Sequence, residues 1–262
     1  MKHQINRITS ALSVYGDSGG GGCDGLDWTI EWFDEIDSTN EYLIGMRDID
    51  RRVCIAEQQT AGRGRRGRQW EAKKSGSVLM SMGWGVSGKN WAGLSLVSGL
   101  AVMRALQCVG VKNAGLKWPN DVLVEDKKIC GILVEMSAGK CVIGVGINID
   151  LGEHPDFTAD RPWTDLTRLG LSVDRDQLAA AVLYYHGVMV ERCLNDGFSN
   201  FVADWNAVHV YQDKMVNIIQ TDCSFSAMAK GVDEEGALIV EAEGENIHLT
   251  SAEVSIRPNW PD

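Results

Sequence analysis

The segment with the clearest chemical potential is 57–70, EQQTAGRGRRGRQW, in which arginine alternates with glycine. Its arginines are Arg63, Arg65, Arg66 and Arg68, and its glycines are Gly62, Gly64 and Gly67. The whole chain is acidic, with 25 Lys+Arg against 36 Asp+Glu and a net charge of −11, so this positive cluster stands out. Guanidinium groups bind phosphate oxygens in pairs, and glycine lets the backbone approach a ligand closely. The segment therefore predicts a site for a polyanion such as a nucleoside triphosphate, with a solvated basic loop as the alternative.

Well-known nucleotide-binding patterns do not account for this segment. Residues 62–67 satisfy GxGxxG, but the dinucleotide fingerprint needs a helix to begin at the third glycine. Here Trp70 and a lysine-rich turn lead toward another strand. Neither HRD nor DFG occurs, which excludes a protein-kinase loop. A nucleic-acid surface would interleave aromatic residues with the arginines, and only Trp70 follows them.

Three further polar clusters lie downstream. They are GLKWPND (115–121), with Lys117, Asn120 and Asp121; DKKICGILVE (126–135), with Lys128; and GVGIN (144–148), which ends at Asn148. Lys128 begins an apolar run, so it is either a turn residue or a cation directed into a dry pocket. No nucleophile–base pair is present, and the five histidines show no metal-ligand spacing. Any chemistry should therefore work by positioning and charge stabilisation, as in phosphoryl and nucleotidyl transfer.

Length and composition indicate a folded protein rather than a disordered one. The 262 residues allow one large domain, or one with a small companion, and the apolar content of 44% is ordinary for a globular protein. The seven cysteines include no CxxC pair, which favours buried, reduced thiols. The N-terminus lacks an apolar signal-peptide core, and the apolar run 94–103 is too short to span a bilayer. We therefore expect a cytoplasmic protein with no membrane partner.

Hydrophobic periodicity predicts an α+β fold. The expected elements are a helix in 1–15, a glycine-rich linker at 16–25, a strand at 29–33, a helix opened by DSTNEYL, strands at 53–58 and 77–84, a helix in 91–109, three strands between 114 and 149, helices at 174–195 and 197–206, and four short strands between 214 and 257. Ser38, with Glu41 three positions later, forms a capping box for the second helix. The last four strands predict a small β-barrel appended to the main domain.

Four motifs occur in the order DSTNEYL, QQTAGRGRRGRQW, KWPNDVLVEDKKICGILVE and VIGVGINI. Together they closely resemble the bacterial biotin protein ligases, also called biotin–[acetyl-CoA-carboxylase] ligases, from about Trp28 to Arg257. The resemblance implies a class II synthetase-like catalytic domain, with a mixed or antiparallel sheet and helices, followed by a small SH3-like β-barrel. The implied organisation is a short helix and linker at 1–27, a biotin- and ATP-binding catalytic domain at 28–212 and the barrel at 213–262.

The resemblance also implies a two-step reaction that uses ATP, biotin and Mg²⁺. Biotin's carboxylate attacks the α-phosphate of ATP to give biotinyl-5′-AMP and diphosphate. The ε-amine of one lysine on a biotin carboxyl carrier protein, a subunit of acetyl-CoA carboxylase, then attacks this mixed anhydride. No covalent enzyme intermediate is needed, which agrees with the absence of a nucleophile–base pair from the sequence motifs. The implied partner is that carrier protein, with no nucleic acid, and the enzyme would be a monomer or a homodimer.

The family's motifs imply roles for individual residues. Those implied to bind biotin are Ser38, Thr39, Asn40, Gln59, Gly62, Arg63, Arg65, Lys128 and Gly131. Those implied to bind ATP or the adenylate are Arg63, Arg65, Arg66, Arg68, Trp70, Lys117, Asn120, Lys128 and Asn148. The implied catalytic residues are Lys128, Arg65 and Asp121. Lys128 would lie between biotin's carboxylate and the α-phosphate, Asp121 would accept a proton from the incoming lysine, and the metal ligands are left open.

Two alternatives to a monofunctional biotin ligase follow from the same resemblance. Some relatives carry an N-terminal winged-helix domain and double as repressors of biotin synthesis. Only 27 residues precede Trp28, so we expect an enzyme that does not bind DNA. Lipoate ligases share the architecture but attach a different acid. The intact GRGRRGRQW and KWPND segments favour biotin over lipoate.

Overall fold

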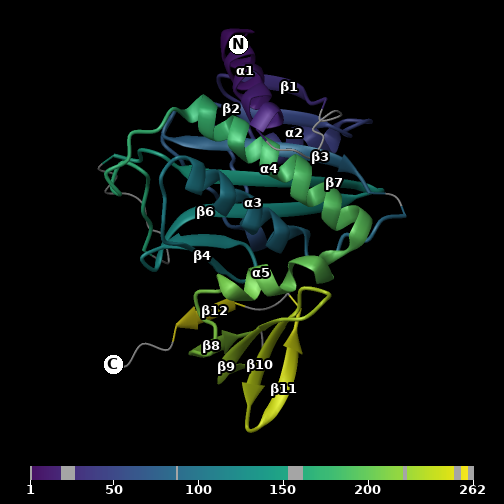
Figure 1. The fold of residues 1–262 in the computed structure, drawn as a ribbon, viewed down its shortest axis with the longest axis vertical. Coiled ribbons are helices and arrows are strands. Elements are labelled where there is room, and N and C mark those ends of the chain that lie inside the picture. Colours follow the sequence, from purple (N-terminus) through teal and green to yellow (C-terminus); the bar gives the residue numbers. More distant parts are fainter. Residues whose placement is uncertain are drawn as a thin grey trace.

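The molecule consists of a larger body, in which helices cover a β-sheet, and a smaller β-sheet unit beyond α5 (Val202–Ala207) (Figure 1). The computed structural model describes residues 2–18, 27–86, 88–152, 162–220, 223–250 and 255–258. Among these residues, strands follow one another without an intervening helix between residues 114 and 148 and again between residues 215 and 258, as in antiparallel meanders. The α+β class predicted from the sequence is therefore correct.

A seven-stranded mixed sheet forms the centre of the larger body. Its strands, in spatial order, are β1 (Thr29–Phe33), β2 (Arg52–Ala56), β3 (Ser77–Gly85), β7 (Lys140–Asn148), β6 (Lys127–Ser137), β5 (Asp121–Val124) and β4 (Ala114–Lys117). β1 and β2 run parallel, and the other neighbouring pairs are antiparallel. The long strands β3, β7 and β6 occupy the middle of this sheet. The short strand β4 was not predicted, because AGLK contains no β-branched residue.

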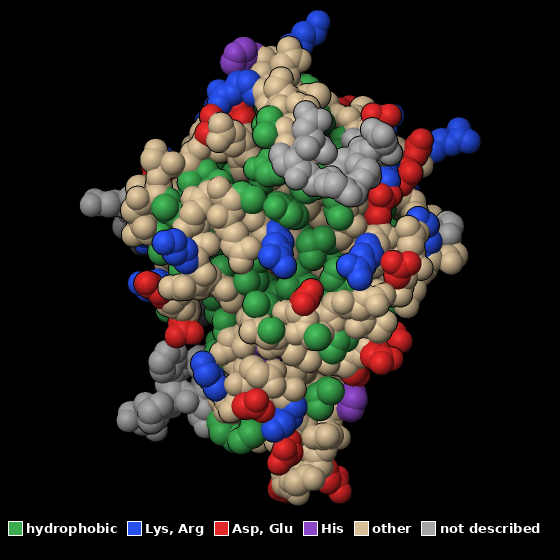
Figure 2. Space-filling view, viewed as in Figure 1, with side chains coloured by type: hydrophobic (Ala, Val, Ile, Leu, Met, Phe, Trp, Pro, Cys, Tyr) green, Lys and Arg blue, Asp and Glu red, His purple; other side chains and the backbone are tan. Residues whose placement is uncertain are grey.

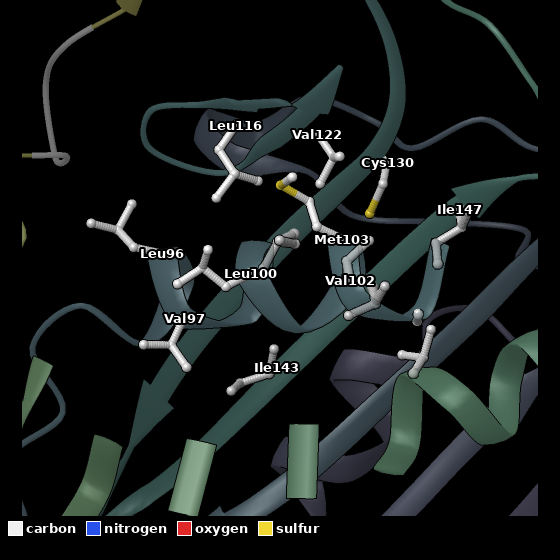
Figure 3. Close-up of a cluster of buried hydrophobic side chains, with 14 of the residues drawn as sticks. Leu96, Val97, Leu100, Val102, Met103, Leu116, Val122, Cys130, Ile143 and Ile147 are labelled. Carbon is white, nitrogen blue, oxygen red and sulfur yellow. The ribbon is translucent and has the colours of Figure 1, made fainter. Parts of the chain in front are cut away.

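Helices cover both faces of this sheet. They are α1 (Lys2–Ser18), α2 (Thr39–Gly45), α3 (Leu94–Cys108) and α4 (Arg175–Asp196), with short 3₁₀ turns η1 (Arg65–Gly67) and η2 (Phe198–Phe201). α3 and α4 pack side by side, and α1 packs along α4 (Figure 1). Alternate residues of a strand point to opposite faces. Ile143 of β7 accordingly joins the large core that contains α3 and α4 (Figure 3), whereas its neighbour Val142 joins a small cluster under Leu43 of α2.

The starts of two helices show how local sequence sets the element boundaries. Ser38 caps α2 by accepting a hydrogen bond from the backbone N–H of Glu41, as the capping box predicts. α3 begins at Leu94, later than expected, because Gly93 has a left-handed backbone with φ of 72°. A side chain at Gly93 would also collide with the Phe198 ring. α1 extends to Ser18, so the first residues of the expected linker 16–25 are helical, and the rest lie outside the described residues.

The smaller unit is an antiparallel sheet in the order β11-β10-β9-β8-β12. Its strands are β8 (Met215–Ile219), β9 (Ser224–Val232), β10 (Leu238–Ala242), β11 (Glu245–Leu249) and β12 (Ser255–Pro258). The first four strands agree with the sequence prediction. β12 is a fifth strand that the prediction missed, and it pairs with β8 at the edge of the sheet.

The cysteines within the described residues are all unpaired. Four are buried and two are exposed: Cys54, Cys130, Cys141 and Cys193, and Cys108 and Cys223, respectively. Cys23 lies outside the described residues. The expectation of reduced thiols holds for these six, although two of them are not buried. Among the described helices, none is long and apolar enough to cross a bilayer.

The face of the molecule that carries α3 and α4 keeps apolar side chains in contact with solvent (Figure 2). Val188 of α4 is 42% exposed, and Val14 of α1 is 63% exposed. Scattered apolar side chains of this kind are common on protein surfaces. This face lies on the opposite side of the central sheet from α2.

The smaller sheet unit and the residues just before it contact the KWPND segment and the strand that leads into it. The indole N–H of Trp118, which is 1% exposed, donates a 3.1 Å hydrogen bond to the carbonyl of Gly236. Leu116 of β4 exchanges backbone hydrogen bonds with Val208 and Val210, just before β8 begins. The smaller unit therefore supports the segment that leads into β5.

Trp118→Phe is expected to lower the free energy of unfolding by about 1–3 kcal/mol, because it removes this hydrogen bond and part of a buried ring. Urea denaturation followed by circular dichroism measures the change. Trp91→Phe is the matched control, since Trp91 is 57% exposed and should shift stability by less than about 0.5 kcal/mol. Equal losses in the two variants would contradict the attachment described here.

Candidate functional site

A cavity of about 350 Å³ lies over β3, β6 and β7, between the N-terminus of α2 and segment 59–71. The residues predicted from the sequence that line it are Ser38, Thr39, Asn40, Gln59, Arg63, Arg65, Arg68, Trp70, Asn120, Asp121, Lys128, Gly131 and Asn148. Three predicted residues, Gly62, Arg66 and Lys117, do not line it. The fold thus brings all four sequence motifs around one space.

A polar network at the start of α2 forms one wall of the cavity. The backbone N–H of Thr39 donates to Gln59 Oε1 at 2.8 Å, and the Thr39 hydroxyl lies 3.0 Å from the same oxygen. Ser81 Oγ lies 2.7 Å from Thr39 Oγ1 and 2.5 Å from Asn40 Oδ1. Thr39, Asn40 and Ser81 are buried, and hydrogen bonding offsets the cost of their burial. The network presents fixed donors and acceptors to a small polar head group.

The arginine–glycine segment folds back on itself at the mouth of the cavity. Trp70 N–H donates to the Gly62 carbonyl at 2.9 Å, and Gly64 N–H donates to the Arg68 carbonyl at 2.7 Å. Its tip is the turn η1, in which Arg66 has a left-handed backbone with φ of 58°. Arg66, at this turn, is not among the residues that line the cavity.

Two arginines attach this segment to other parts of the fold. Arg65 Nη1 donates to Asn120 Oδ1 at 3.3 Å. Arg63 Nη2 lies 2.8 Å from Glu135 Oε1, and its Nη1 lies 3.8 Å from Glu41 Oε2. All three arginines Arg63, Arg65 and Arg68 line the cavity, and Arg63 binds carboxylates of the protein.

Lys128 and Asp121 form an ion pair in the cavity wall. Lys128 Nζ lies 2.5 Å from Asp121 Oδ1 and 5.3 Å from the centroid of the Trp70 ring. The Asp121 side chain is 7% exposed and that of Lys128 is 26% exposed. Of the two sequence interpretations, the structure supports a cation directed into a pocket.

The floor of the cavity is built from glycines of β6 and β7. A Cβ atom on Gly131 would lie 2.7 Å from Trp70 Cζ3, and one on Gly146 would lie 2.5 Å from Trp70 Cε2. A Cβ atom on Gly144 would collide with Asn40 Oδ1. Bare backbone is therefore required at these positions for the Trp70 ring and the Asn40 amide to reach the sheet.

The end of the cavity near Asn148 and Trp163 offers one polar atom that has no partner among the described residues. Asn148 is 4% exposed; its amide N–H donates to the Thr164 carbonyl at 3.1 Å, and among the described residues its Oδ1 has no partner. Trp163 lines this end, and the Arg168 guanidinium lies 3.8 Å from its ring centroid. A free amide acceptor beside an indole face suits a flat base with an exocyclic amino group.

The chain matches the biotin/lipoate A/B protein ligase family over residues 32–151 and the biotin protein ligase C-terminal domain over residues 213–257. The chain belongs to the biotin/lipoate A/B protein ligase family.

Relatives of this ligase include the bifunctional ligase/repressor BirA of Salmonella typhimurium, 34% identical over 233 residues that cover 85% of this chain and 72% of that protein. The biotin–[acetyl-CoA-carboxylase] ligase of Mycobacterium tuberculosis is 33% identical over 229 residues, which cover 83% of this chain and 85% of that protein. The structure of the biotin protein ligase from Aquifex aeolicus in complex with biotin and ATP has a TM-score of 0.80 at 29% identity, covering 88% of this chain and 99% of that one. The sequence-based resemblance is thus confirmed.

Several cavity residues of the ligase were given no individual role in the sequence analysis. They are Gly64, Gln69, Glu71, Leu79, Met80, Ile132, Leu133, Gly144, Val145, Gly146 and Trp163. Most belong to apolar strands and carry no chemical signal of their own. Gly144 and Gly146 stand in the GVGIN cluster, where two glycines inside a strand could have indicated close approach of another group. Lys117 is buried, with Nζ 5.9 Å from the Tyr211 ring centroid, outside the cavity lining.

Charged groups beside the cavity hold the base of the arginine–glycine segment. Arg175 hydrogen-bonds both carboxylate oxygens of Glu57, and the hydroxyl of Ser75 donates to one of them. The hydrogen bonds from Arg175 keep the pKa of the Glu57 carboxyl below its usual value. By contrast, burial raises the pKa of the Cys130 thiol, so this cysteine is a neutral core residue and not a nucleophile.

Gly131→Val is expected to raise the KM for biotin about ten-fold or more, because the new side chain displaces Trp70 and Lys128 from the cavity floor. Steady-state kinetics with biotin varied would measure the effect. Gly45→Ala is the matched control, since nothing lies within 4 Å of a Cβ atom at Gly45. An unaltered KM in Gly131→Val, with the control also unaltered, would place biotin elsewhere.

Proposed function

We propose that the ligase activates biotin as biotinyl-5′-AMP and transfers it to one lysine of the biotin carboxyl carrier protein of acetyl-CoA carboxylase. The observation that carries this proposal is the Lys128 ammonium group, held by Asp121 beside the glycine floor and the Trp70 ring. The related Aquifex aeolicus protein is a biotin protein ligase solved with biotin and ATP. The related Mycobacterium tuberculosis protein is named a biotin–[acetyl-CoA-carboxylase] ligase.

In the first step, a biotin carboxylate oxygen bonds to the α-phosphorus and the bond from that phosphorus to the diphosphate oxygen breaks. We assign Lys128 to stabilise the negative charge that develops between the carboxylate and the phosphate, since a preorganised cation in a dry site is effective there. Arg65 and Arg68 supply further positive charge for the phosphates. Asn148 Oδ1, which has no partner within the described part of the chain, supports a role in accepting a hydrogen bond from the amino group of adenine.

In the second step, the carrier lysine's amine attacks the acyl carbon of the adenylate and AMP leaves. The amine must lose a proton for the amide to form. We assign Asp121 as the acceptor, because its carboxylate lies in the cavity wall. Its pairing with Lys128 fixes the carboxylate in place.

We propose that Mg²⁺ enters with ATP rather than at a dedicated protein site. Among the described residues, no group of three or more His, Cys, Asp or Glu side chains could hold a metal. Mg²⁺ commonly keeps its waters and binds one or two protein oxygens together with substrate phosphates. Asn120 and Asp121 are the cavity residues whose oxygens suit this role, and the ion would neutralise phosphate charge there.

We also propose the organisation and location expected from the sequence. The N-terminal helix and linker would comprise 1–27, the catalytic domain 28–212 and the C-terminal unit 213–262. The six cysteines that the structure describes form no disulfide among themselves, which is compatible with work in the reducing cytoplasm, where ATP is available.

ATP–diphosphate exchange, followed by transfer to a purified carrier domain, tests the function. Exchange should depend on biotin, and labelling should fall on one carrier lysine. Exchange that depends on lipoate instead would identify lipoate rather than biotin as the substrate, and the proposed adenylation chemistry would still hold. Absence of exchange with either acid, from protein shown to be folded by circular dichroism, would refute the proposal.

Lys128→Ala is expected to lower the kcat of adenylation by about 10²–10³-fold, or about 3–4 kcal/mol of barrier, since one preorganised charge is lost. Single-turnover formation of biotinyl-5′-AMP measures this rate. Lys127→Ala, which removes the adjacent exposed lysine, should leave it unchanged. Equal rates in Lys128→Ala and wild type would exclude the charge-stabilising role of Lys128 in adenylation.

Arg65→Gly is expected to release biotinyl-5′-AMP into solution, because the bond from Arg65 to Asn120 is lost along with a charge over the phosphates. The free adenylate would then acylate lysines of a bystander protein, detected by streptavidin blotting. Arg47→Gly, at an exposed arginine that does not line the cavity, is the control and should label only the carrier. Carrier-only labelling by Arg65→Gly would argue against retention by this arginine.

A further inference from the structure

Glu135 of β6 uses both oxygens of its carboxylate on residues of the cavity wall. Its Oε2 accepts a 2.9 Å hydrogen bond from Asn40 Nδ2, and its Oε1 lies 2.8 Å from Arg63 Nη2. Asn40 and Arg63 both line the cavity, whereas Glu135 itself does not. Glu135 thus lies directly behind two groups that face the substrate, and its own side chain is 23% exposed.

Asn40 depends on this carboxylate for the orientation of its amide. Its Oδ1 lies 2.5 Å from Ser81 Oγ, and its Nδ2 donates to the Leu133 carbonyl at 3.3 Å as well as to Glu135. An amide whose oxygen and nitrogen each meet a matching partner cannot turn over without losing both sets of bonds. Gly144 provides the space for the amide, because a Cβ atom there would collide with Asn40 Oδ1.

Arg63 depends on the same carboxylate for the attachment of the arginine–glycine segment. Most backbone bonds of segment 62–70 are internal to it. Two of its arginines, Arg63 and Arg65, contact side chains elsewhere in the described residues, and Arg65 binds Asn120, which we place beside the ATP phosphates. Arg63 binds Glu135, which touches no substrate group. The second partner of Arg63, Glu41, is farther away at 3.8 Å and its side chain is 64% exposed, so it contributes little.

We propose that Glu135 is a positioning residue for the ligase reaction, an inference that rests on the function proposed above. Its carboxylate holds the Arg63 guanidinium and the Asn40 amide together, so that segment 62–70 stays over the cavity before and after ATP is consumed. The adenylate is bound to the enzyme only by non-covalent contacts. We call the contacts of Glu135 with Arg63 and Asn40 the latch, and these contacts slow the release of the adenylate. Glu135 takes no part in bond formation.

Glu135→Gln tests the latch while keeping the side-chain shape. The amide retains one acceptor oxygen and presents N–H donors in place of the other, so only one of the two bonds can persist. Release of preformed radiolabelled biotinyl-5′-AMP into an excess of unlabelled adenylate should be about ten-fold faster, the loss expected for one charge-assisted hydrogen bond. The KM for biotin should rise, whereas kcat for adenylation at saturating substrates should stay within about two-fold of wild type.

A double-mutant cycle with Arg63→Met shows whether Glu135 acts through Arg63. If it does, the double variant should release the adenylate no faster than the more affected single variant. The release rate of wild type should also rise with KCl concentration, since the pair is partly exposed and salt screens it. That rise should be much smaller in Glu135→Gln.

Glu191→Gln is the matched control, because Glu191 pairs with Arg51 elsewhere on the surface. It should leave release, KM and kcat unchanged. Unchanged release in Glu135→Gln, from a wild type that shows biotin-dependent exchange, would overturn the latch and leave the proposed function intact. Additive effects in the cycle would likewise overturn it. A wild type without exchange would overturn the proposed function first, and the latch with it.

Discussion

The candidate active site depends on a place in the central sheet where two neighbouring strands carry no side chains. Gly131 of β6 and Gly146 of β7 are direct partners in the antiparallel ladder, and the Trp70 indole lies against both. Because the ring rests almost on the backbone, the arginine–glycine segment that ends at Trp70 can extend over the sheet. The same ring lies under the ammonium group of Lys128. The paired glycines Gly131 and Gly146 therefore allow the Trp70 ring, the Lys128 ammonium group and the arginine–glycine segment to lie around a single cavity.

Short-range features of the fold were predictable, and pairings between distant segments were not. The Ser38 cap and the arginine–glycine segment are encoded within a few residues, and the structure contains both. β4 escaped prediction because AGLK becomes a strand through its pairing with β5 and with residues 208–210. Lys128 could be singled out by its type, but its distance from Asp121 depends on the register between β5 and β6. Glu135 gave no signal, since a carboxylate at the end of a strand usually faces solvent.

Distant parts of the chain fix the cavity walls from behind. The smaller sheet unit reaches Trp118 through Gly236, and so supports the segment that carries Asn120. On the other side, Arg175 at the start of α4 holds Glu57 at the base of the arginine–glycine segment. These contacts are made to the scaffold rather than to substrate, so changes there would alter geometry without removing a chemical group.

The distribution of strong and weak contacts around the cavity fits a reaction whose intermediate is bound only by non-covalent contacts. Lys128 and Asp121 lie in the sheet wall, where limited exposure keeps their attraction strong and their geometry constant. Arg63, which attaches the covering segment, is 43% exposed, and ion pairs of that kind are modest in strength. A stronger, buried attachment would retain the adenylate better but would also bar the carrier lysine from the acyl carbon. A chain with no covalent intermediate must satisfy both demands with the same segment, and a partly exposed pair of intermediate strength is the arrangement that does so.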